Sequence, residues 1–221
     1  MGFYSQDGEL KARSYPRTFG QEVEVALSAL DCLLNGEKAI YVSSDLTTGK
    51  RFFRLLREYG ARDSSDLKLK LGEERYRLLL WDPNTAAAND FARRIREQFG
   101  GNKLVITPAP FVAPSWSQAE YLVFWETCIR TRVEAVFFND SWQYSNGCTY
   151  EFAVAQSECV RTFDSDGMPL HLEEGIMLIA EAVRDLEAEG IQPIELRTNL
   201  TRLRKLRQPP RHHEGPRRPF Q

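Results

Sequence analysis

The chain has 221 residues, of which 42% are hydrophobic and 27% are charged, and its formal net charge is −2. This composition is typical of a soluble globular protein, and the near balance of charges gives no reason to expect a nucleic-acid polymer or a membrane surface as partner. No apolar run approaches the roughly 20 residues of a membrane span, and the N-terminus lacks the apolar core of a signal peptide. We therefore expect a cytoplasmic protein.

Four cysteines are present, without the paired spacing of a metal site or a redox motif. We expect reduced structural thiols, as is usual in a reducing compartment. Only Cys148, which lies in a predicted loop, is a candidate for reactivity. The histidines form no metal-binding set with a cysteine pair, so we predict neither a metal nor another cofactor.

The first part of the chain is predicted to alternate helices and strands. Residues 1–37 are expected to form an arm followed by a helix, because leucines recur there at helical spacing. Ala39–Ser43 is the first predicted strand, and a helix with an apolar face follows over Lys50–Tyr59. The charged region Arg62–Glu74 is predicted to be a surface connection.

Two more strands are predicted before the middle of the chain, over Tyr76–Trp81 and Lys103–Thr107. Asp82–Asn84 is expected to turn the chain after the first of them, and helical spacing follows over Thr85–Phe99. Prolines then hold the backbone extended before a predicted helix over Ser117–Arg130.

A short apolar run, Ala135–Phe138, is typical of a parallel strand that is buried on both faces. After a polar loop, a helix is predicted to begin at Tyr150. It is followed by a strand over Cys159–Phe163, a helix over Glu173–Glu189 and a short last strand over Ile191–Glu195.

This alternation predicts an α/β fold, a Rossmann-like parallel sheet sandwiched between helices in a single domain over residues 38–196. Residues 197–221 are basic and end in a segment rich in proline and arginine. We expect them to form a disordered or lightly docked tail.

The loop after Ala135–Phe138 is the strongest site candidate, because ligands of open parallel sheets bind at the carboxyl ends of the strands. Glu151 is predicted to fall in the first turn of the following helix, where the backbone amides stabilise an anion and lower its pKa. Trp142 and Tyr144 are interpreted either as walls of a ligand pocket or as packing anchors.

The order and spacing of Trp142, Ser145, Gly147, Glu151 and Ala155 resemble the W-x-x-S-x-G…E…A pattern of the nucleoside 2-deoxyribosyltransferase-like superfamily. That superfamily includes nucleoside deoxyribosyltransferases and nucleoside 5′-monophosphate N-glycosidases. The resemblance implies that Glu151 is the nucleophile that attacks the anomeric carbon of the sugar. It also implies a homo-oligomer, because these enzymes complete their pockets with a neighbouring subunit. Ser145 matches the serine of the monophosphate glycosidases, whereas the deoxyribosyltransferases carry an aspartate there.

The loop after the first predicted strand is the second candidate. Ser43, Ser44 and Lys50 supply hydroxyls and a cation next to the free amides of a helix start, which suits an anion such as phosphate. An ordinary helix capped by Thr47 or Thr48 is the alternative interpretation.

The resemblance extends to this loop, which in the superfamily begins with a tyrosine on the first strand and lines the sugar and the phosphate. Tyr41 matches that tyrosine. Asp45 stands where the monophosphate glycosidases have a phosphate-binding serine, and its carboxylate would repel phosphate. Ser145 and Asp45 thus favour different substrates, and we favour a nucleotide that is bound by Lys50 and the local amides.

Ser117 and Glu120 fit a capping box, which accounts for Glu120 as part of a helix cap. The resemblance offers another role, because the superfamily places a second acid near the start of the helix that precedes the catalytic strand, where it assists the departing base. Glu120 is the nearest match, and Glu134 and Asp140 are weaker alternatives.

We therefore expect cleavage or transfer of an N-glycosidic bond in a nucleoside or nucleoside 5′-monophosphate, through a glycosyl-enzyme intermediate on Glu151. Glu120 would assist departure of the base. One alternative is a TIR-like NAD glycohydrolase, which has a similar layout and a catalytic glutamate near a loop with tryptophan, serine and cysteine. The others are a nucleotide-sensing module without turnover and a structural protein whose loop carboxylate is buried and paired.

Overall fold

The computed structural model describes residues 20–109 and 111–207, and at its centre four parallel strands form a sheet in the order β2-β1-β3-β4. The strands are β1 (Ala39–Ser43), β2 (Val105–Ile106), β3 (Val133–Phe138) and β4 (Arg161–Phe163). Every residue of β1 is buried, as expected of a strand that is covered on both faces.

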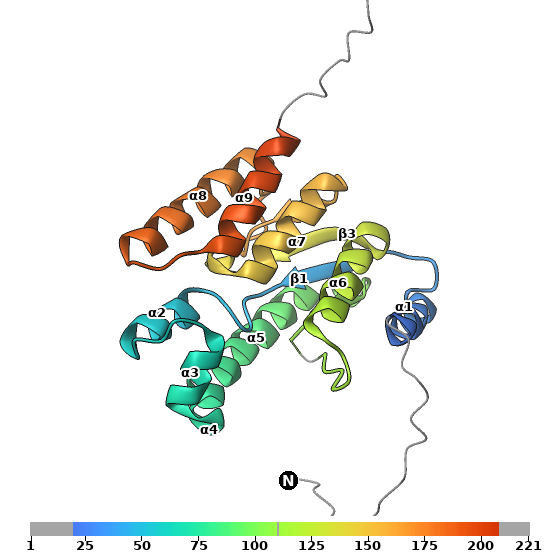
Figure 1. Ribbon diagram of the computed structural model, residues 1–221. Helices are drawn as coiled ribbons and strands as arrows, with labels where there is room; N and C mark the ends of the chain where they lie inside the picture. The colour runs from blue at the N-terminus through green and yellow to red at the C-terminus, as the bar shows by residue number, and fades with distance from the viewer. Residues whose placement is uncertain (1–19, 110, 208–221) are drawn as a thin grey trace, which may run out of the picture.

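Helices connect the strands and surround the sheet (Figure 1). The α-helices of the described residues are α1 (Gln21–Leu34), α2 (Lys50–Glu58), α3 (Ser64–Leu71), α4 (Glu73–Tyr76), α5 (Asp82–Gln98), α6 (Gln118–Arg132), α7 (Asn146–Ser157), α8 (Leu172–Ala188) and α9 (Ile194–Leu206). A π-helical turn, η1 (Arg77–Trp81), joins α4 to α5, and a 3₁₀ turn, η2 (Trp142–Tyr144), precedes α7. No helix among these is long and apolar enough to cross a membrane.

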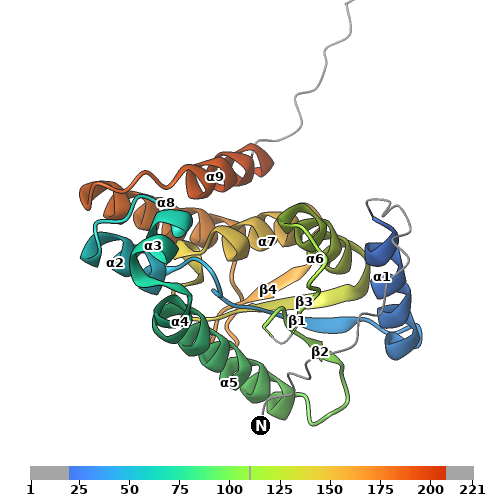
Figure 2. The same cartoon turned by 60° about the horizontal axis from the view of Figure 1, so that its bottom comes forward.

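The two faces of the sheet are covered differently, with α5 on one side and α6 to α9 on the other (Figure 2). Because side chains alternate along a strand, Ile40 and Val42 of β1 pack with Phe91 of α5, whereas Tyr41 faces Trp125 of α6. The predicted α/β fold, a Rossmann-like parallel sheet between two layers of helices, is confirmed.

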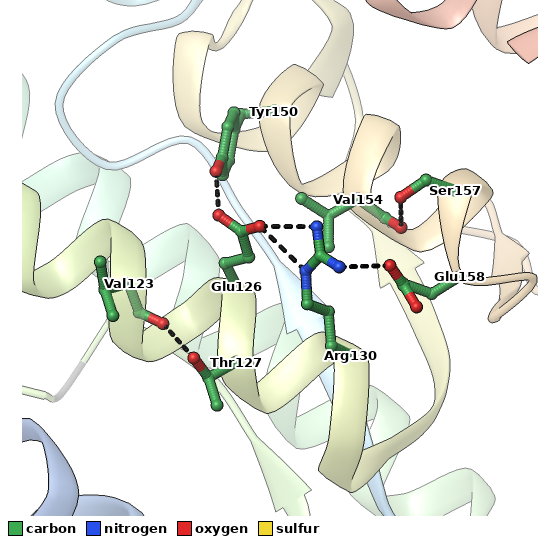
Figure 3. A network of polar contacts seen from close by, with 8 residues as sticks. All are labelled: Val123, Glu126, Thr127, Arg130, Tyr150, Val154, Ser157 and Glu158. Carbon is green, nitrogen blue, oxygen red and sulfur yellow. Dashed lines mark hydrogen bonds and ion pairs between the residues drawn. The ribbon is translucent and has the colours of Figure 1, made fainter.

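A chain of polar contacts joins α6 to α7 on the second face (Figure 3). Glu126 accepts a hydrogen bond from the Tyr150 hydroxyl and one from Nε of Arg130 at 2.9 Å, and Arg130 also reaches Glu158 at 2.5 Å. On the side of α9, the guanidinium of Arg202 lies 5.3 Å from the centre of the Tyr150 ring. Tyr150 thus contacts both α6 and α9.

Several predicted elements form close to their expected bounds. The strand Ala39–Ser43 has those bounds in the structure, and β3 begins two residues before the predicted run. The helices predicted over Lys50–Tyr59, Ser117–Arg130 and Glu173–Glu189 correspond to α2, α6 and α8.

The strand predicted over Tyr76–Trp81 is wrong, because this segment continues the helix from α4 through η1 into α5. Tyr76 and Leu80 are buried while Leu78 is 53% exposed, which is a helical pattern rather than an alternating one. Asp82–Asn84 is therefore not a turn. The π-helical turn lies directly before Pro83, and this wider turn accommodates a residue that has no N–H and whose ring crowds the preceding turn.

Three further expectations need correction. The region Arg62–Glu74, predicted to be a surface connection, contains α3. The strands predicted over Lys103–Thr107 and Cys159–Phe163 shorten to β2 and β4.

The predicted strand Ile191–Glu195 and the first part of the predicted tail are replaced by α9, which packs on α7 and α8. Leu196, Leu200 and Leu203 of α9 are buried, while its arginines lie mostly on the exposed face. The amphipathic spacing of these leucines thus decides the structure here, and the basic composition does not. The remaining tail and the N-terminal arm, residues 208–221 and 1–19, lie outside the described residues.

Candidate active site

The carboxylate of Glu151 is held at the carboxyl end of the sheet by two hydroxyls of β1. Tyr41 donates a hydrogen bond to Oε1 at 2.7 Å, and Ser43 donates one to Oε2 at 2.6 Å. Tyr41 and Ser43 point to the same face because they are two residues apart in a strand. Each carboxylate oxygen thus has its own donor, which fixes the orientation of the group, and Glu151 keeps part of its surface accessible.

Burial raises the pKa of Glu151 to about 7, and the hydrogen bonds from Ser43 and Tyr41 oppose this rise. This corrects the expectation of a lowered pKa. The helix α7 begins at Asn146, four residues before the predicted start, so Glu151 lies in its second turn. The N-terminal amides act strongly only within the first turn, and here the desolvation of the carboxylate outweighs them.

The loop between β1 and α2 contacts the start of α7. The Thr48 hydroxyl lies 3.3 Å from the Ser145 hydroxyl and accepts a hydrogen bond from the backbone N–H of Asn146 at 3.0 Å. Ser145 is also the N-cap of α7, where its hydroxyl accepts from the N–H of Cys148. The two loops that the sequence singles out are therefore adjacent, and Ser145 joins them.

Trp142 and Tyr144 are both buried, with 3% and 8% of their surface exposed. Trp142 packs against the rings of Phe138 and Phe152, with centroids 4.8 and 4.7 Å away. This position agrees with the packing interpretation of Trp142. Tyr144 donates a hydrogen bond to Asp185 of α8, and its ring lies 4.6 Å from Nζ of Lys50.

Asp45 and Lys50 line a cavity at the carboxyl ends of the strands, and Glu151 is not among the described residues that line it. Asp45 accepts a hydrogen bond from Nδ2 of Asn139 at 2.6 Å, and burial raises the pKa of its carboxyl group, although the bond from Asn139 opposes this. Ser44 is buried, and its hydroxyl has no hydrogen-bond partner among the described residues. The candidate residues thus form two groups. One lies around the first turns of α7 and consists of Tyr41, Ser43, Ser145 and Glu151. The other faces the cavity and consists of Asp45 and Lys50.

Glu120 is 4% exposed and completes the capping box of α6. Its carboxylate accepts hydrogen bonds from the backbone N–H of Ser117 at 2.7 Å and from the Ser117 hydroxyl at 2.8 Å. Of the weaker alternatives, Glu134 is at the start of β3, at the opposite end of the sheet. Asp140 lies in the loop after β3, where it lines the cavity and accepts a hydrogen bond from the Ser165 hydroxyl. Gly147 is exposed in the first turn of α7.

Cys148 is fully surrounded by protein, and burial raises the pKa of its thiol well above the usual range. A thiol in this state is a poor nucleophile, so the structure gives Cys148 a packing role. Cys128 is buried as well, whereas Cys32 and Cys159 are exposed. Among the described residues, no group of three or more histidine, cysteine, aspartate or glutamate side chains could hold a metal ion.

Sequence reasoning missed several polar residues at this edge of the sheet. Asn139 binds Asp45, Thr48 binds Ser145, and the buried Thr107 hydroxyl has no partner among the described residues. Asn139 and Thr107 directly follow β3 and β2, so the rule that sites form at strand ends could have found them. Nothing in the local pattern marks Thr48 apart from its possible role as a helix cap.

Comparisons with protein-family models, with curated proteins and with solved structures found no match.

Proposed function

We propose that the chain is a member of the nucleoside 2-deoxyribosyltransferase-like superfamily and that it cleaves or transfers the N-glycosidic bond of a nucleoside or nucleoside 5′-monophosphate, with Glu151 as nucleophile. The observation that carries this proposal is the Glu151 carboxylate, which accepts hydrogen bonds from Tyr41 and Ser43 at the carboxyl end of a parallel sheet. The sequence motif from Trp142 to Ala155, which contains Glu151, supports it.

The reaction would proceed in two displacements, as in retaining glycosidases. A Glu151 oxygen attacks the anomeric carbon, the bond from that carbon to the base nitrogen breaks, and its electron pair leaves with the base. Water, or the nitrogen of a second base, then attacks the same carbon and releases the carboxylate. Tyr41 and Ser43 hold the carboxylate during both steps, which leaves little reorientation for the transition state.

With a pKa of about 7, a large fraction of Glu151 is the carboxylate at neutral pH, and the raised basicity of this anion favours its attack. The Tyr41 hydroxyl keeps its proton, because burial and the nearby Glu151 carboxylate raise its pKa well above the usual range. Tyr41 therefore stays a hydrogen-bond donor throughout the physiological pH range.

The decisive test replaces Glu151 with glutamine, which keeps the size of the side chain and cannot form a stable glycosyl ester. Substrates would be screened by mass spectrometry for release of the base, with nucleosides, nucleoside 5′-monophosphates and NAD in the panel. We expect turnover to fall by at least about a thousandfold, or roughly 4 kcal/mol of transition-state stabilisation.

Glu158→Gln is the matched control, because Glu158 follows the same helix and its removal changes the charge equally at a place that is remote from Tyr41 and Ser43. The wild-type protein, quenched with a slow fluorinated sugar analogue, should carry the sugar on the peptide that contains Glu151. An active Glu151→Gln variant, or an adduct on another peptide, would refute the mechanism.

We propose Glu120 as the acid that assists the departing base, and a glutamine at this position separates that role from helix capping. Glutamine at the third helical position still completes a capping box with Ser117. Glu120→Gln should thus leave the melting temperature nearly unchanged and lower kcat about 100-fold or more for substrates with poor leaving bases. An unchanged kcat would assign Glu120 to the cap alone.

The homo-oligomer is also part of this proposal. Leu122 and Val123 of α6 are 38% and 44% exposed, and Val112 in the preceding loop is 69% exposed. Burial of such residues against a second copy would remove apolar surface from water. Light scattering of the wild type and of Val123→Lys tests this, and a fully active wild-type monomer at assay concentration would contradict it.

A further inference from the structure

A cavity of about 900 Å³ lies at the carboxyl edge of the sheet, bounded by α2, α5 and α8. Cavities of this size hold small molecules and cofactors, and the carboxyl end of a parallel sheet is their usual place. Glu151 is not among the described residues that line this cavity, so the contacts of its carboxylate do not account for the cavity.

Basic side chains dominate the part of the cavity wall formed by α2 and α5. They are Lys50, Arg51, Arg54, Arg57 and Arg94. Among the described residues only Arg57 of this set forms an ion pair, with Glu189 at 2.9 Å. The guanidinium of Arg94 lies 5.3 Å from the centre of the Phe91 ring, and the ammonium of Lys50 lies 4.6 Å from that of Tyr144. Four cations thus face the cavity without a carboxylate bound to them.

The acidic residues of the wall are each engaged with another group. Asp45 accepts from Asn139, Asp185 from the Tyr144 hydroxyl, and Asp140 from the Ser165 hydroxyl, while Glu189 pairs with Arg57. None of these contacts uses Lys50, Arg54 or Arg94, whereas the positive charge of Arg51 also acts on the Asp45 carboxylate. Each carboxylate keeps its charge and further acceptor positions, so the wall carries five cations against four carboxylates, and the cations gather on the side formed by α2 and α5.

One of these cations is held in place by a buried polar contact. Asn84 of α5 is 5% exposed, accepts a hydrogen bond from Nε of Arg51 at 3.0 Å and donates one to the backbone oxygen of Leu46 at 3.0 Å. Asn84 thus joins α5 to the loop after β1 and orients the guanidinium of Arg51. The terminal nitrogens of Arg51 remain available to a ligand, because Asn84 uses only Nε.

We propose that this cavity binds a small molecule that carries a di- or triphosphate group, held by Lys50, Arg51, Arg54 and Arg94. Guanidinium groups match the geometry of phosphate oxygens through paired hydrogen bonds, and four cations exceed what a single phosphate needs. Apolar side chains, among them Phe53, Phe91 and Leu186, also line the cavity and offer a surface for an organic group attached to the phosphates. Lys50 is shared with the proposed substrate site, whereas Arg51, Arg54 and Arg94 have no part in the proposed reaction at Glu151.

Isothermal titration calorimetry of the full chain, at about 50 mM salt so that screening is limited, tests the site with three probes. We expect tripolyphosphate and ATP to bind more tightly than adenosine, which carries no phosphate. Tighter binding of ATP than of tripolyphosphate would show that the organic group is recognised as well, and equal binding would show recognition of the phosphate chain; both results support the site. Adenosine binding as tightly as ATP, or no binding of either phosphorylated probe, would overturn the proposal.

Neighbouring arginines on α5 provide a matched pair of variants. Arg94 lines the cavity, whereas Arg93 forms exposed ion pairs with Asp90 and Glu97 outside it. Arg94→Gln and Arg54→Gln should each weaken tripolyphosphate binding about tenfold or more, the usual effect of losing a charge-assisted hydrogen bond. Arg93→Gln removes the same charge and should change the affinity less than about twofold. Equal losses in Arg93→Gln and Arg94→Gln would show nonspecific attraction and overturn the site.

Binding by Glu151→Gln separates this proposal from the proposed glycosidic reaction. The variant should bind tripolyphosphate with wild-type affinity, whether or not turnover depends on Glu151. An intact far-UV circular dichroism spectrum for each variant would confirm that a loss of binding is local.

Discussion

The carboxylate of Glu151 is subject to two opposing effects, and its protonation state depends on their difference. Burial favours the neutral acid, whereas the hydroxyls of Tyr41 and Ser43 favour the anion because they donate to its two oxygens. The effect of burial is larger than that of the two hydrogen bonds, so the pKa of Glu151 rises to about 7. A small change in either effect would thus move the group between its two forms near neutral pH.

The rate of the proposed reaction should therefore follow the ionisation of Glu151. Since the nucleophile is the anion, kcat/KM should rise with pH and level off above about pH 7. Tyr41→Phe and Ser43→Ala each remove a donor that lowers this pKa, so both variants should shift the rising limb to higher pH. A pH–rate profile measures the shift.

Tyr150→Phe is the control for that profile. Tyr150 precedes Glu151 in the chain, but its hydroxyl donates to Glu126 and does not contact the Glu151 carboxylate. Its limb should coincide with that of the wild type. A limb that falls with rising pH, or one that ignores Tyr41 and Ser43, would exclude Glu151 as the titrating nucleophile.

Among the elements, the loop between β1 and α2 depends on one glycine. Gly49 has φ of +128°, a conformation that side-chain-bearing residues rarely adopt, and a Cβ built on it would lie 2.3 Å from Oδ2 of Asp45. Gly49→Ala should therefore displace the loop, cost about 1–3 kcal/mol of stability and lower turnover. Chemical denaturation and an activity assay measure both effects.

Gly147→Ala, in the first turn of α7, is the matched control for Gly49→Ala. Gly147 is helical and exposed, and the nearest atom to an added Cβ would be the Ser145 hydroxyl oxygen at 3.9 Å. This variant should fold with nearly unchanged stability. If both alanine variants behave alike, the loop does not need the conformation that Gly49 supplies.

The helix α9 is expected to contribute to stability through its buried leucines. Leu203 is fully buried in the hydrophobic core on the α7 side of the sheet, whereas Leu206 of the same helix is 40% exposed. Leu203→Ala should cost about 2–5 kcal/mol in the free energy of unfolding, and Leu206→Ala less than about 1 kcal/mol. Urea denaturation would show a similar small cost for both variants if α9 were only loosely attached.

For the whole molecule, the raised pKa of Glu151 makes the free energy of unfolding depend on pH. Between its ordinary value of 4.5 and about 7, the folded chain keeps a proton that the unfolded chain has released. Stability should therefore fall as pH rises through this range, by up to about 3 kcal/mol for a shift of this size. Glu151→Gln cannot titrate, so it should flatten this part of the curve.

Urea denaturation at pH values from 5 to 8 measures this dependence, and Glu158→Gln serves as the control because it leaves Glu151 in place. The control should keep the wild-type slope. A slope that persists unchanged in Glu151→Gln would mean that another group accounts for it.

The hydrophobic pattern predicted the secondary structure best where an element is buried on all of its faces. Ala39–Ser43 is apolar, short and buried on both faces, so its strand bounds could be read directly. Tyr76–Trp81 is also a short apolar run of the kind that forms strands, yet it lies within a long helix. The difference is set by its neighbours, since burial of Tyr76 and Leu80 on one helical face is a tertiary property that a short apolar run does not reveal.

The candidate site followed the same division. Their places at a strand end and a helix start pointed to Ser43 and Glu151, and the resemblance to the superfamily pointed to Tyr41. The structure places the three side chains in contact. The sequence could not predict the direction of the pKa shift of Glu151, because that direction depends on how much water the folded chain excludes. Nor could it predict the cavity, whose cations come from α2 and α5, helices that are joined through Asn84 only in the folded chain.

The alternation of side chains along β1 makes this strand intolerant of insertions and deletions. Tyr41 and Ser43 reach Glu151 on one face, while Ile40 and Val42 fill the core on the other. A one-residue insertion before Tyr41 would exchange the faces, so that aliphatic side chains would meet the Glu151 carboxylate and hydroxyls would enter the apolar layer under α5. Over evolutionary time, changes of length should therefore accumulate in the connections around β1, and the strand itself should vary only by substitution.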